Sequence, residues 1–403
     1  MYDAIVVGTR CAGAPTAMLL ARKGYRVLAV DRASFPSDTL STLIIHPPGV
    51  AALRRWGLLD DVLASNCPPI ERYSFDFGPV AIAGRPHPAD GVSFGCAPRR
   101  TILDKLLVDA ADRAGAEVRE RFNVDEVVVD DGAVVGIRGH ASNGTTVFER
   151  ARVVVGADGW NSFVARSVGA AAYNTKPKLE VAYYTFWSGL PVDGVETVIR
   201  PYRGWGAIPT NDGLTLVIMG WPWAEAAAFK ADVEGNYLKT FELVPELAER
   251  IRGATRVERL KGRAVPNFLR QPFGPGWALV GDAGYTKDPI TAQGISDAFR
   301  DAELCATALD QAFTGARSFE EALSDYHRTR DARALPMYEL TTQFATLEPP
   351  PPEMQQLLGA VSGNREAMDA FVSVVAGTVS PVEFFDPANV GRLMGLVPAT
   401  QPS

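Results

Sequence analysis

Apolar residues near the start of this 403-residue chain follow the pattern of buried strands separated by a helix. Residues 2–8 and 26–31 are largely apolar runs, and residues 12–23 between them have helical periodicity that ends at Gly24. Continuous apolar runs are typical of parallel strands that are covered on both faces. The pattern therefore predicts an α/β domain that begins with a strand–helix–strand unit.

Further helices are predicted over residues 50–63, 101–114 and 232–252, and a series of strands with turn residues between them extends from residue 117 to residue 156. Near the end of the chain we expect a long helix over residues 291–313. Two more helices are expected, over residues 319–333 and 336–345. The proline run at residues 349–352 then breaks the chain, and we expect a small helical tail after it.

Between about residues 176 and 261 the pattern changes to alternating, aromatic-rich segments, which predict an antiparallel sheet. A short stretch around residues 73–80 alternates in the same way. Such a sheet can form one wall of a substrate cavity. Four of its aromatic residues are the candidates for facing a substrate, with a place in the core as the alternative for each: Tyr183, Trp187, Trp205 and Trp221.

Two strand-to-helix corners carry the candidate chemistry. The first strand opens onto Gly8-Thr9-Arg10-Cys11-Ala12-Gly13, where small residues lead into a helix whose free N–H groups can receive a pyrophosphate. Arg10 stands where the middle glycine of the usual motif would be. Its guanidinium either contacts the cofactor or points to solvent. Asp31 ends the second strand, where it can accept hydrogen bonds from a ribose or simply start a turn with Arg32.

The second corner is Gly281-Asp282, which is followed at fixed spacing by Asp288-Pro289 and by Ala292-Gln293-Gly294-Ile295. A third motif, Val155-Gly156-Ala157-Asp158-Gly159, lies in mid-chain. Together these motifs resemble the FAD-dependent oxidoreductases of the p-hydroxybenzoate hydroxylase-like superfamily. That superfamily includes class A flavoprotein monooxygenases, geranylgeranyl reductase-like enzymes and flavin-dependent halogenases. The resemblance spans at least residues 1–340.

The resemblance implies a Rossmann-like FAD-binding domain that is discontinuous, over residues 1–72, 95–175 and 262–340. It also implies an inserted substrate domain over residues 73–94 and 176–261, followed by a helical C-terminus over residues 341–403. FAD would be bound without a covalent link. The cofactor-binding residues that it implies are Gly8, Arg10, Gly13, Asp31, Arg32, Arg100, Asp158, Gly281, Asp282, Ala292, Gly294 and Ile295.

Two of these assignments have alternatives. Arg99 could take the place of Arg100, and Asp158 could act only as a helix cap. The candidate catalytic residues are Pro289 and Gln293 beside the reactive flavin edge, and His46, which could position a substrate or move a proton. A purely structural role is the alternative for His46.

The branch of the superfamily is predicted from departures in its motifs. Halogenation is disfavoured for two reasons. No lysine lies between Lys23 and Lys105, and residues 204–209 lack a tryptophan at both of the positions where the halogenase motif has one, since Trp205 aligns with neither. Residues 288–295 are similar to the reductase motif, but Ser41 stands in place of that branch's cysteine. We therefore expect an FAD-dependent monooxygenase that uses NAD(P)H and O₂ on an apolar organic molecule. A double-bond reductase is the alternative, and a flavin-loaded binding or sensing protein is a third possibility.

Composition narrows the partners. The 40 basic and 47 acidic residues give a net charge of −7 without long runs of one sign, so nucleic acid is not an expected partner. The four cysteines are widely spread and form no metal-ligand motif. No apolar run reaches membrane-spanning length, and no secretory segment is recognisable, so we expect a cytoplasmic protein. The sequence does not determine the oligomeric state.

Overall fold

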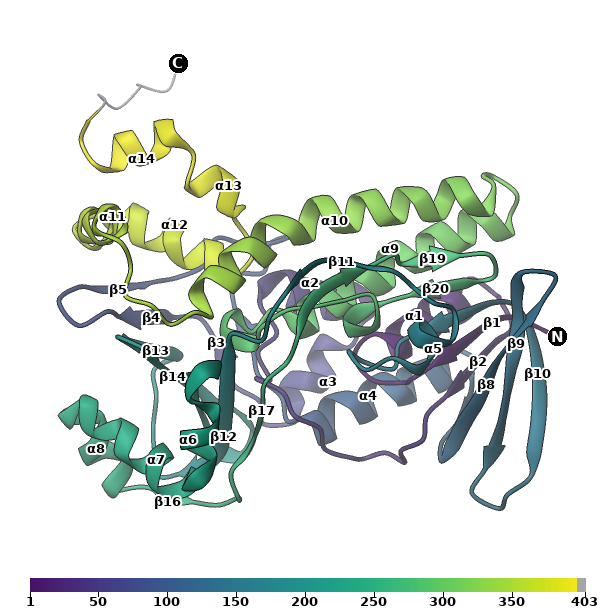
Figure 1. The fold of residues 1–403 in the computed structure, drawn as a ribbon, viewed down its shortest axis with the longest axis horizontal. Helices are drawn as coiled ribbons and strands as arrows, with labels where there is room; N and C mark the ends of the chain where they lie inside the picture. The colour runs from purple at the N-terminus through teal and green to yellow at the C-terminus, as the bar shows by residue number, and fades with distance from the viewer. Residues whose placement is uncertain (397–403) are drawn as a thin grey trace.

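The computed structural model describes residues 1–396, and its centre is a largely parallel sheet in the order β19-β20-β10-β1-β2-β7 (Figure 1). Apart from Asp3, every residue of β1 is buried, as the apolar pattern predicts for a central parallel strand. The strands are β1 (Tyr2–Val7), β2 (Val27–Val30), β7 (Glu117–Arg119), β10 (Thr146–Gly156), β19 (Phe273–Gly274) and β20 (Trp277–Leu279).

Helices cover one face of this sheet and form the largest apolar core with it. The other face is covered by β8 (Phe122–Asp130) and β9 (Ala133–Ala141), which continue from β10 as an antiparallel ribbon, together with α5 (Phe163–Ser167). The helices of the first face are α1 (Gly13–Arg22), α2 (Pro47–Trp56), α3 (Leu59–Ala64), α4 (Arg100–Arg113), α9 (Gly294–Phe313) and the start of α10 (Phe319–Phe344).

A second sheet has the order β16-β12-β15-β14-β13-β4-β5, with β17 paired to β12. Strand β13 pairs in parallel with β4, which brings the short alternating stretch near residue 75 into the aromatic-rich sheet. The strands are β4 (Tyr73–Asp76), β5 (Ala81–Gly84), β12 (Glu180–Ser188), β13 (Val195–Arg200), β14 (Arg203–Pro209), β15 (Thr215–Pro222), β16 (Thr255–Arg256) and β17 (Lys261–Arg263).

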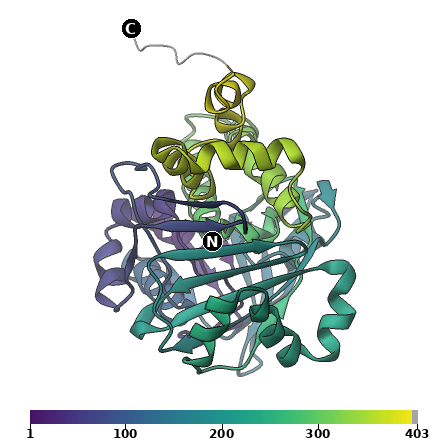
Figure 2. The ribbon, with the colours of Figure 1, turned by 90° about the vertical axis from the view of Figure 1, so that its left-hand side faces the viewer.

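The two faces of the second sheet are covered by different segments. One face packs against α6 (Ala226–Ala231), α7 (Val233–Thr240) and α8 (Pro245–Arg252). The other packs against the C-terminal helices, drawn in yellow-green above the sheet in Figure 2. These helices are α11 (Pro352–Ser362), α12 (Arg365–Val375), α13 (Pro381–Phe384) and α14 (Pro387–Leu393). The end of the predicted tail, residues 397–403, lies outside the described residues.

Two small sheets complete the fold. One contains β11 (Ala172–Lys176), β18 (Asn267–Arg270) and β21 (Tyr285–Thr286), and the other pairs β3 (Pro69–Ile70) with β6 (Gly95–Cys96). Within residues 1–396, no helix has both the length and the apolar character that a membrane crossing requires.

Three helix predictions are corrected. The helix predicted over residues 50–63 is interrupted at Gly57, which ends α2 in the left-handed conformation (φ 75°). The helix predicted over residues 232–252 is interrupted before Pro245, which begins α8. Conversely, the two helices predicted on either side of residue 335 are one helix, α10, which continues through Pro336. Buried side chains on both sides of that proline hold the helix together despite the missing N–H.

Candidate functional site

A cleft of about 750 Å³ lies at the carboxyl ends of the parallel strands. Gly8 after β1, Asp31 after β2, Asp158 after β10 and Asp282 after β20 all line it. These four residues are far apart in sequence, and they meet because parallel strands present their carboxyl ends at the same edge of a sheet. The two predicted corners therefore face one shared space.

The glycines of the first corner are sterically required. A Cβ atom on Gly13 would lie 1.7 Å from the carbonyl oxygen of Gly8, and one on Gly8, which has φ 93°, would lie 2.5 Å from that of Ala157. The tight turn leads directly into α1, and no side chain caps the N-terminus of this helix. The N–H of Ala14 donates to the carbonyl oxygen of Arg10, and Pro15 has no N–H, so the backbone N–H groups available to an anionic ligand such as a diphosphate are those of Cys11, Ala12 and Gly13.

Arg10 does not extend into solvent, and its guanidinium is held by the protein. It donates to the side-chain oxygen of Ser37 at 2.7 Å, forms an ion pair with Asp104 and lies over the ring of Phe35. Arg100 binds the same carboxylate from the other side, with its Nε 3.0 Å from Oδ1 of Asp104. Buried Asp104 thus fixes two arginines in the cleft wall.

Arg99, the alternative to Arg100, is directed elsewhere. It pairs with Glu258 and lies over the ring of Phe186, with its guanidinium carbon 3.8 Å from the ring centre. Only Arg100 of the two lines the cleft.

The acidic residues of the cleft differ in how much of their carboxylate is already engaged. Asp31 accepts from the backbone N–H groups of Thr9 and Ala33, each at 2.8 Å. Asp158 accepts from Ser162 at 2.5 Å and from the backbone of Phe163 at 2.6 Å. Both carboxylates therefore also organise the turns that carry them, as the alternative predictions expected. Arg32 is exposed at the cleft.

The second corner is built as tightly as the first. Gly281 has φ 57°, and a Cβ there would lie 2.7 Å from the Cβ of Ala12 on the first corner. Asp282 follows with its side chain open to the cleft, and Gly294 begins α9 with free space where a Cβ would project. Ala292 and Ile295 line the same stretch. The cleft offers backbone and helix starts along its length, which suits an extended dinucleotide.

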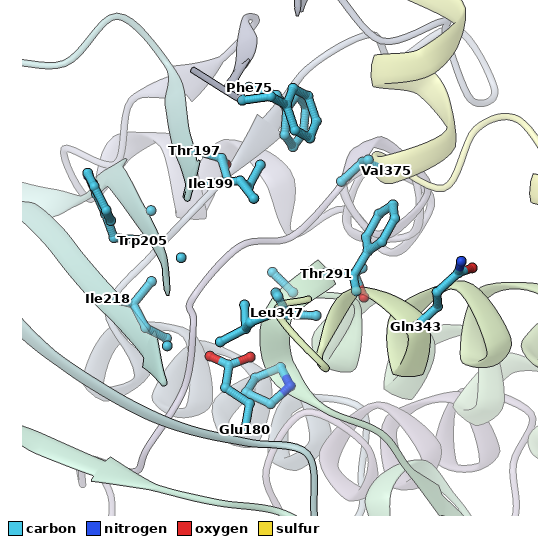
Figure 3. A pocket seen from close by; sticks show the side chains of 18 of the residues that line it. Phe75, Glu180, Thr197, Ile199, Trp205, Ile218, Thr291, Gln343, Leu347 and Val375 are labelled. Carbon is cyan, nitrogen blue, oxygen red and sulfur yellow. The ribbon is translucent and has the colours of Figure 1, made fainter. Parts of the chain in front are cut away.

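A second, largely apolar cavity of about 230 Å³ adjoins the cleft (Figure 3). Thr42, Pro289 and Ala292 line both spaces, so the two meet at the turn before α9. One wall is the second sheet, where Gly204, Gly206 and other residues of β13 to β15 face inward. The opposite wall comes from the end of α10, the proline run, α11 and α12.

The comparisons agree with this geometry. A model of the FAD-binding domain family matches residues 1–341. The chain belongs to that family. It is 26% identical to the 1H-pyrrole-2-carbonyl-(peptidyl-carrier protein) brominase of Pseudoalteromonas luteoviolacea, over 78% of each chain. It is also 26% identical to the digeranylgeranylglycerophospholipid reductase of Methanocella arvoryzae, over 81% of each chain.

Among solved structures, a similar one is that of PqsL from Pseudomonas aeruginosa, named as a probable FAD-dependent monooxygenase. Its TM-score is 0.72 at 22% identity, over 91% of this chain and 98% of that one. This likeness shows a shared fold. The relatives carry out different reactions, so membership of the FAD-binding family identifies the cofactor and leaves the reaction open.

Three of the four aromatic residues predicted to face the substrate lie on the face of the sheet opposite the cavity. Tyr183, Trp187 and Trp221 pack with α6 to α8 on the far face, whereas residues 184 and 186 of β12 pack toward the cavity side. Successive side chains of a strand alternate between faces, and the pattern alone did not show which face the C-terminal helices would cover. Trp205 lines the cavity and also belongs to the far-face cluster.

Gln293 lines neither the cleft nor the cavity. Its side-chain amide donates to the carbonyl oxygen of Val375 at 2.6 Å and to that of Thr291 at 3.3 Å. The side chain thus joins the turn before α9 to the end of α12, so a role of Gln293 beside the flavin would belong to its backbone.

His46 lines the apolar cavity and is almost fully buried. Its Nε2 lies 3.1 Å from the carbonyl oxygen of Thr291, which can only accept, so Nε2 carries the proton. Its Nδ1 then accepts from the hydroxyl of Tyr73 at 3.1 Å. Burial lowers the pKa of His46 to about 4. This neutral, fully bonded imidazole suits the structural alternative better than proton transfer.

One lysine, Lys287, does line the cleft, and it lies outside the lysine-free segment between Lys23 and Lys105. Lys287 is buried there and bonds to Asp297 and to the hydroxyl of Tyr285. No lysine is among the described residues that line the apolar cavity.

Proposed function

We propose that this flavoprotein is a monooxygenase that uses NAD(P)H and O₂ to hydroxylate or otherwise oxidise a small to medium, largely apolar organic molecule. The observation that carries the proposal is the apolar cavity that adjoins the cleft at Pro289 and Ala292. When bound, FAD supplies the redox chemistry and the activation of O₂. Oxygen transfer also needs a site from which water is excluded.

In this proposal the residues of the cleft share the length of the cofactor. Gly8, Arg10 and Gly13 with the start of α1 hold the diphosphate, while Asp31 and Arg32 bind toward the adenosine. The remaining predicted residues hold the middle of the cofactor and its ring system, namely Arg100, Asp158, Gly281, Asp282, Ala292, Gly294 and Ile295.

The residues of the cavity exclude water and position the substrate. The proline run and helices α11 and α12 close the space from the side opposite the second sheet. Pro289 lies where the two spaces join, and His46 holds the adjacent turn through the carbonyl oxygen of Thr291. The protein's contribution is thus a dry, shaped pocket against one edge of the cofactor.

The test is turnover by the FAD-loaded protein over a panel of apolar aromatic and aliphatic compounds. We expect some compounds to stimulate both NAD(P)H oxidation and oxygen uptake. We also expect one atom of isotopically labelled O₂ in the product. Stimulated NAD(P)H oxidation without label in any product contradicts oxygen transfer.

The second candidate is a double-bond reductase, which is favoured by the similarity of residues 288–295 to the reductase motif and by the reductase relative. Reduction of an alkene under anaerobic conditions would establish it. Halide-dependent product formation would establish halogenation, against which we note that no lysine is among the described residues lining the cavity. A binding or sensing protein would bind compounds without any turnover.

A further inference from the structure

Two buried acidic side chains lie on either side of the wall that separates the cavity from the cleft. Glu180, on β12, is 4% exposed and lines the apolar cavity, and Asp288, directly before Pro289, is 2% exposed and lines the cleft. Figure 3 shows the carboxyl group of Glu180 directed into the cavity. Oε2 of Glu180 and Oδ2 of Asp288 accept no hydrogen bond from any described N–H or O–H donor.

The sheet makes room for this carboxyl group. Gly220, on the neighbouring strand β15, faces Glu180, and a Cβ at that position would lie 1.9 Å from Oε1 of Glu180. Asp288 is held from the other side, because its backbone N–H donates to Asn267 at 2.7 Å and its Oδ1 accepts from the backbone of Ile290 at 3.1 Å. The position of each carboxyl group is therefore set by its own strand or turn.

The two carboxyl groups are direct neighbours, and burial raises the pKa of both above their ordinary values. Two carboxyl groups can form a hydrogen bond only if one of them carries a proton. The raised pKa values favour a pair in which one carboxyl group is protonated and the other carries the single negative charge. No ion pair of either residue is found among the described residues.

The surroundings leave that charge without a partner. No arginine or lysine is among the described residues that line the cavity, and His46 is neutral. The other acidic residue of the lining, Glu348, is exposed at the proline run. The cavity thus has an acidic group at its inner end and another on its outer wall, with apolar side chains between them.

We propose that the Glu180–Asp288 pair is the anchor for a protonated amine, so that the substrate of this cavity is an apolar molecule with one basic nitrogen. The ammonium group donates a hydrogen bond to the carboxyl group of Glu180, which lines the cavity, and its charge neutralises that of the pair. The apolar body then lies between the second sheet and α11. The anchor adds a substrate class to the proposed monooxygenase function. It rests on that function only because it takes the cavity to be the substrate's site.

Other polar groups on the substrate fit this site less well. A carboxylate would bring a second negative charge to a buried acidic pair, which is strongly unfavourable. A hydroxyl group could form a hydrogen bond but would leave the charge of the pair uncompensated. The order of affinity expected for molecules of one carbon skeleton is therefore amine, then alcohol, then carboxylate.

The experiment measures binding to the FAD-loaded protein by calorimetry and by the change in flavin absorption, with phenylbutylamine, phenylbutanol and phenylbutyrate as matched probes near neutral pH. We expect the amine to bind at least about tenfold more tightly than the alcohol. The carboxylate should be the weakest of the three. Equal affinities of amine and alcohol would overturn the proposal without reference to any variant.

The Glu180→Gln variant keeps the shape of the side chain and replaces its ionisable carboxyl group with an amide, which brings two N–H donors toward the bound amine. We expect it to weaken amine binding at least about tenfold and alcohol binding by less than about threefold. The matched control is Glu196→Gln, on the opposite face of the same sheet, where Glu196 pairs with Arg250. Equal loss of amine binding in both variants would overturn the proposal.

These measurements involve no turnover. Amine binding that depends on Glu180 supports the anchor even where no labelled oxygen enters a product, and oxygen transfer to a neutral compound alone supports the proposed function while overturning the anchor. The two ideas can therefore fail separately.

Discussion

The cleft and the adjoining cavity are formed by different kinds of residues. The cleft is formed largely by backbone and small residues at strand ends, and short contiguous motifs carry most of it. The cavity is formed by side chains from many separate parts of the chain, among them β4, β13 to β15 and α10 to α12. A cofactor shared by a family is held by backbone geometry, which motifs record, whereas substrate shape depends on which side chains the tertiary packing brings together.

The largest effect is expected from Gly13→Val, which tests the backbone basis of the cleft. The added side chain collides with the carbonyl oxygen of Gly8, so the turn before α1 cannot close. We expect less than about a tenth of the flavin content of the unmodified protein after gel filtration, measured by absorbance.

The control for that experiment is Gly359→Ala, in α11, where a Cβ meets nothing within 4 Å. This change should leave flavin content unaltered. Full flavin retention by Gly13→Val would mean that the first corner does not hold the cofactor.

Next in size is Gly206→Val, which fills the cavity and spares the cleft. Gly206 faces the cavity on β14, and a Cβ there makes only ordinary contact with Ile218 at 3.5 Å. We expect ligand affinity to fall about tenfold or more, with normal flavin content. Trp187→Phe, on the far face, should leave ligand affinity unchanged. A reversed result would place the ligand on the side that the aromatic pattern first suggested.

Tyr73→Phe tests whether the wall between the two spaces depends on the neutral imidazole. Without the hydroxyl of Tyr73, Nδ1 of buried His46 loses its donor. Urea unfolding should show a loss of about 1–3 kcal/mol in the free energy of unfolding. Tyr183→Phe is the matched change on the far face, and the hydroxyl of Tyr183 should contribute within about 0.5 kcal/mol. Equal losses of stability in the two variants would show that the hydrogen bond between Tyr73 and His46 has no special role.

The smallest effect concerns the pH dependence of the buried acidic pair. Burial raises the pKa of Asp288 to about 6 and that of Glu180 well above its ordinary value. The native state therefore holds protons that the unfolded state releases, and stability falls as pH rises from about 4 through 6.

Glu180→Gln should remove this loss of stability at higher pH. Its stability relative to the unmodified protein should increase by on the order of 1 kcal/mol between about pH 4 and pH 7. Thermal unfolding of the FAD-loaded proteins across that range measures the difference. A difference that is independent of pH would show that the pair does not share a proton.

Much of the fold followed from local pattern. The apolar runs predicted β1 and β2 to within about two residues, and the motif spacing brought Gly8 and Gly281 to one cleft. Helix ends were harder to predict, because Gly57 and Pro245 interrupt helices while Pro336 does not. A proline favours a break locally, but packing on both sides of α10 outweighs it.

The sequence by itself determined the family, the strand–helix–strand start and the residues that line the cleft, because these depend on glycine conformation and strand ends that neighbours in sequence set. Only the tertiary structure decided which face of the second sheet lines the cavity, that the C-terminal helices close the cavity, and that Glu180 lies beside Asp288. A strand's alternation defines two faces without distinguishing them, and the choice is made by whichever distant helices cover each face.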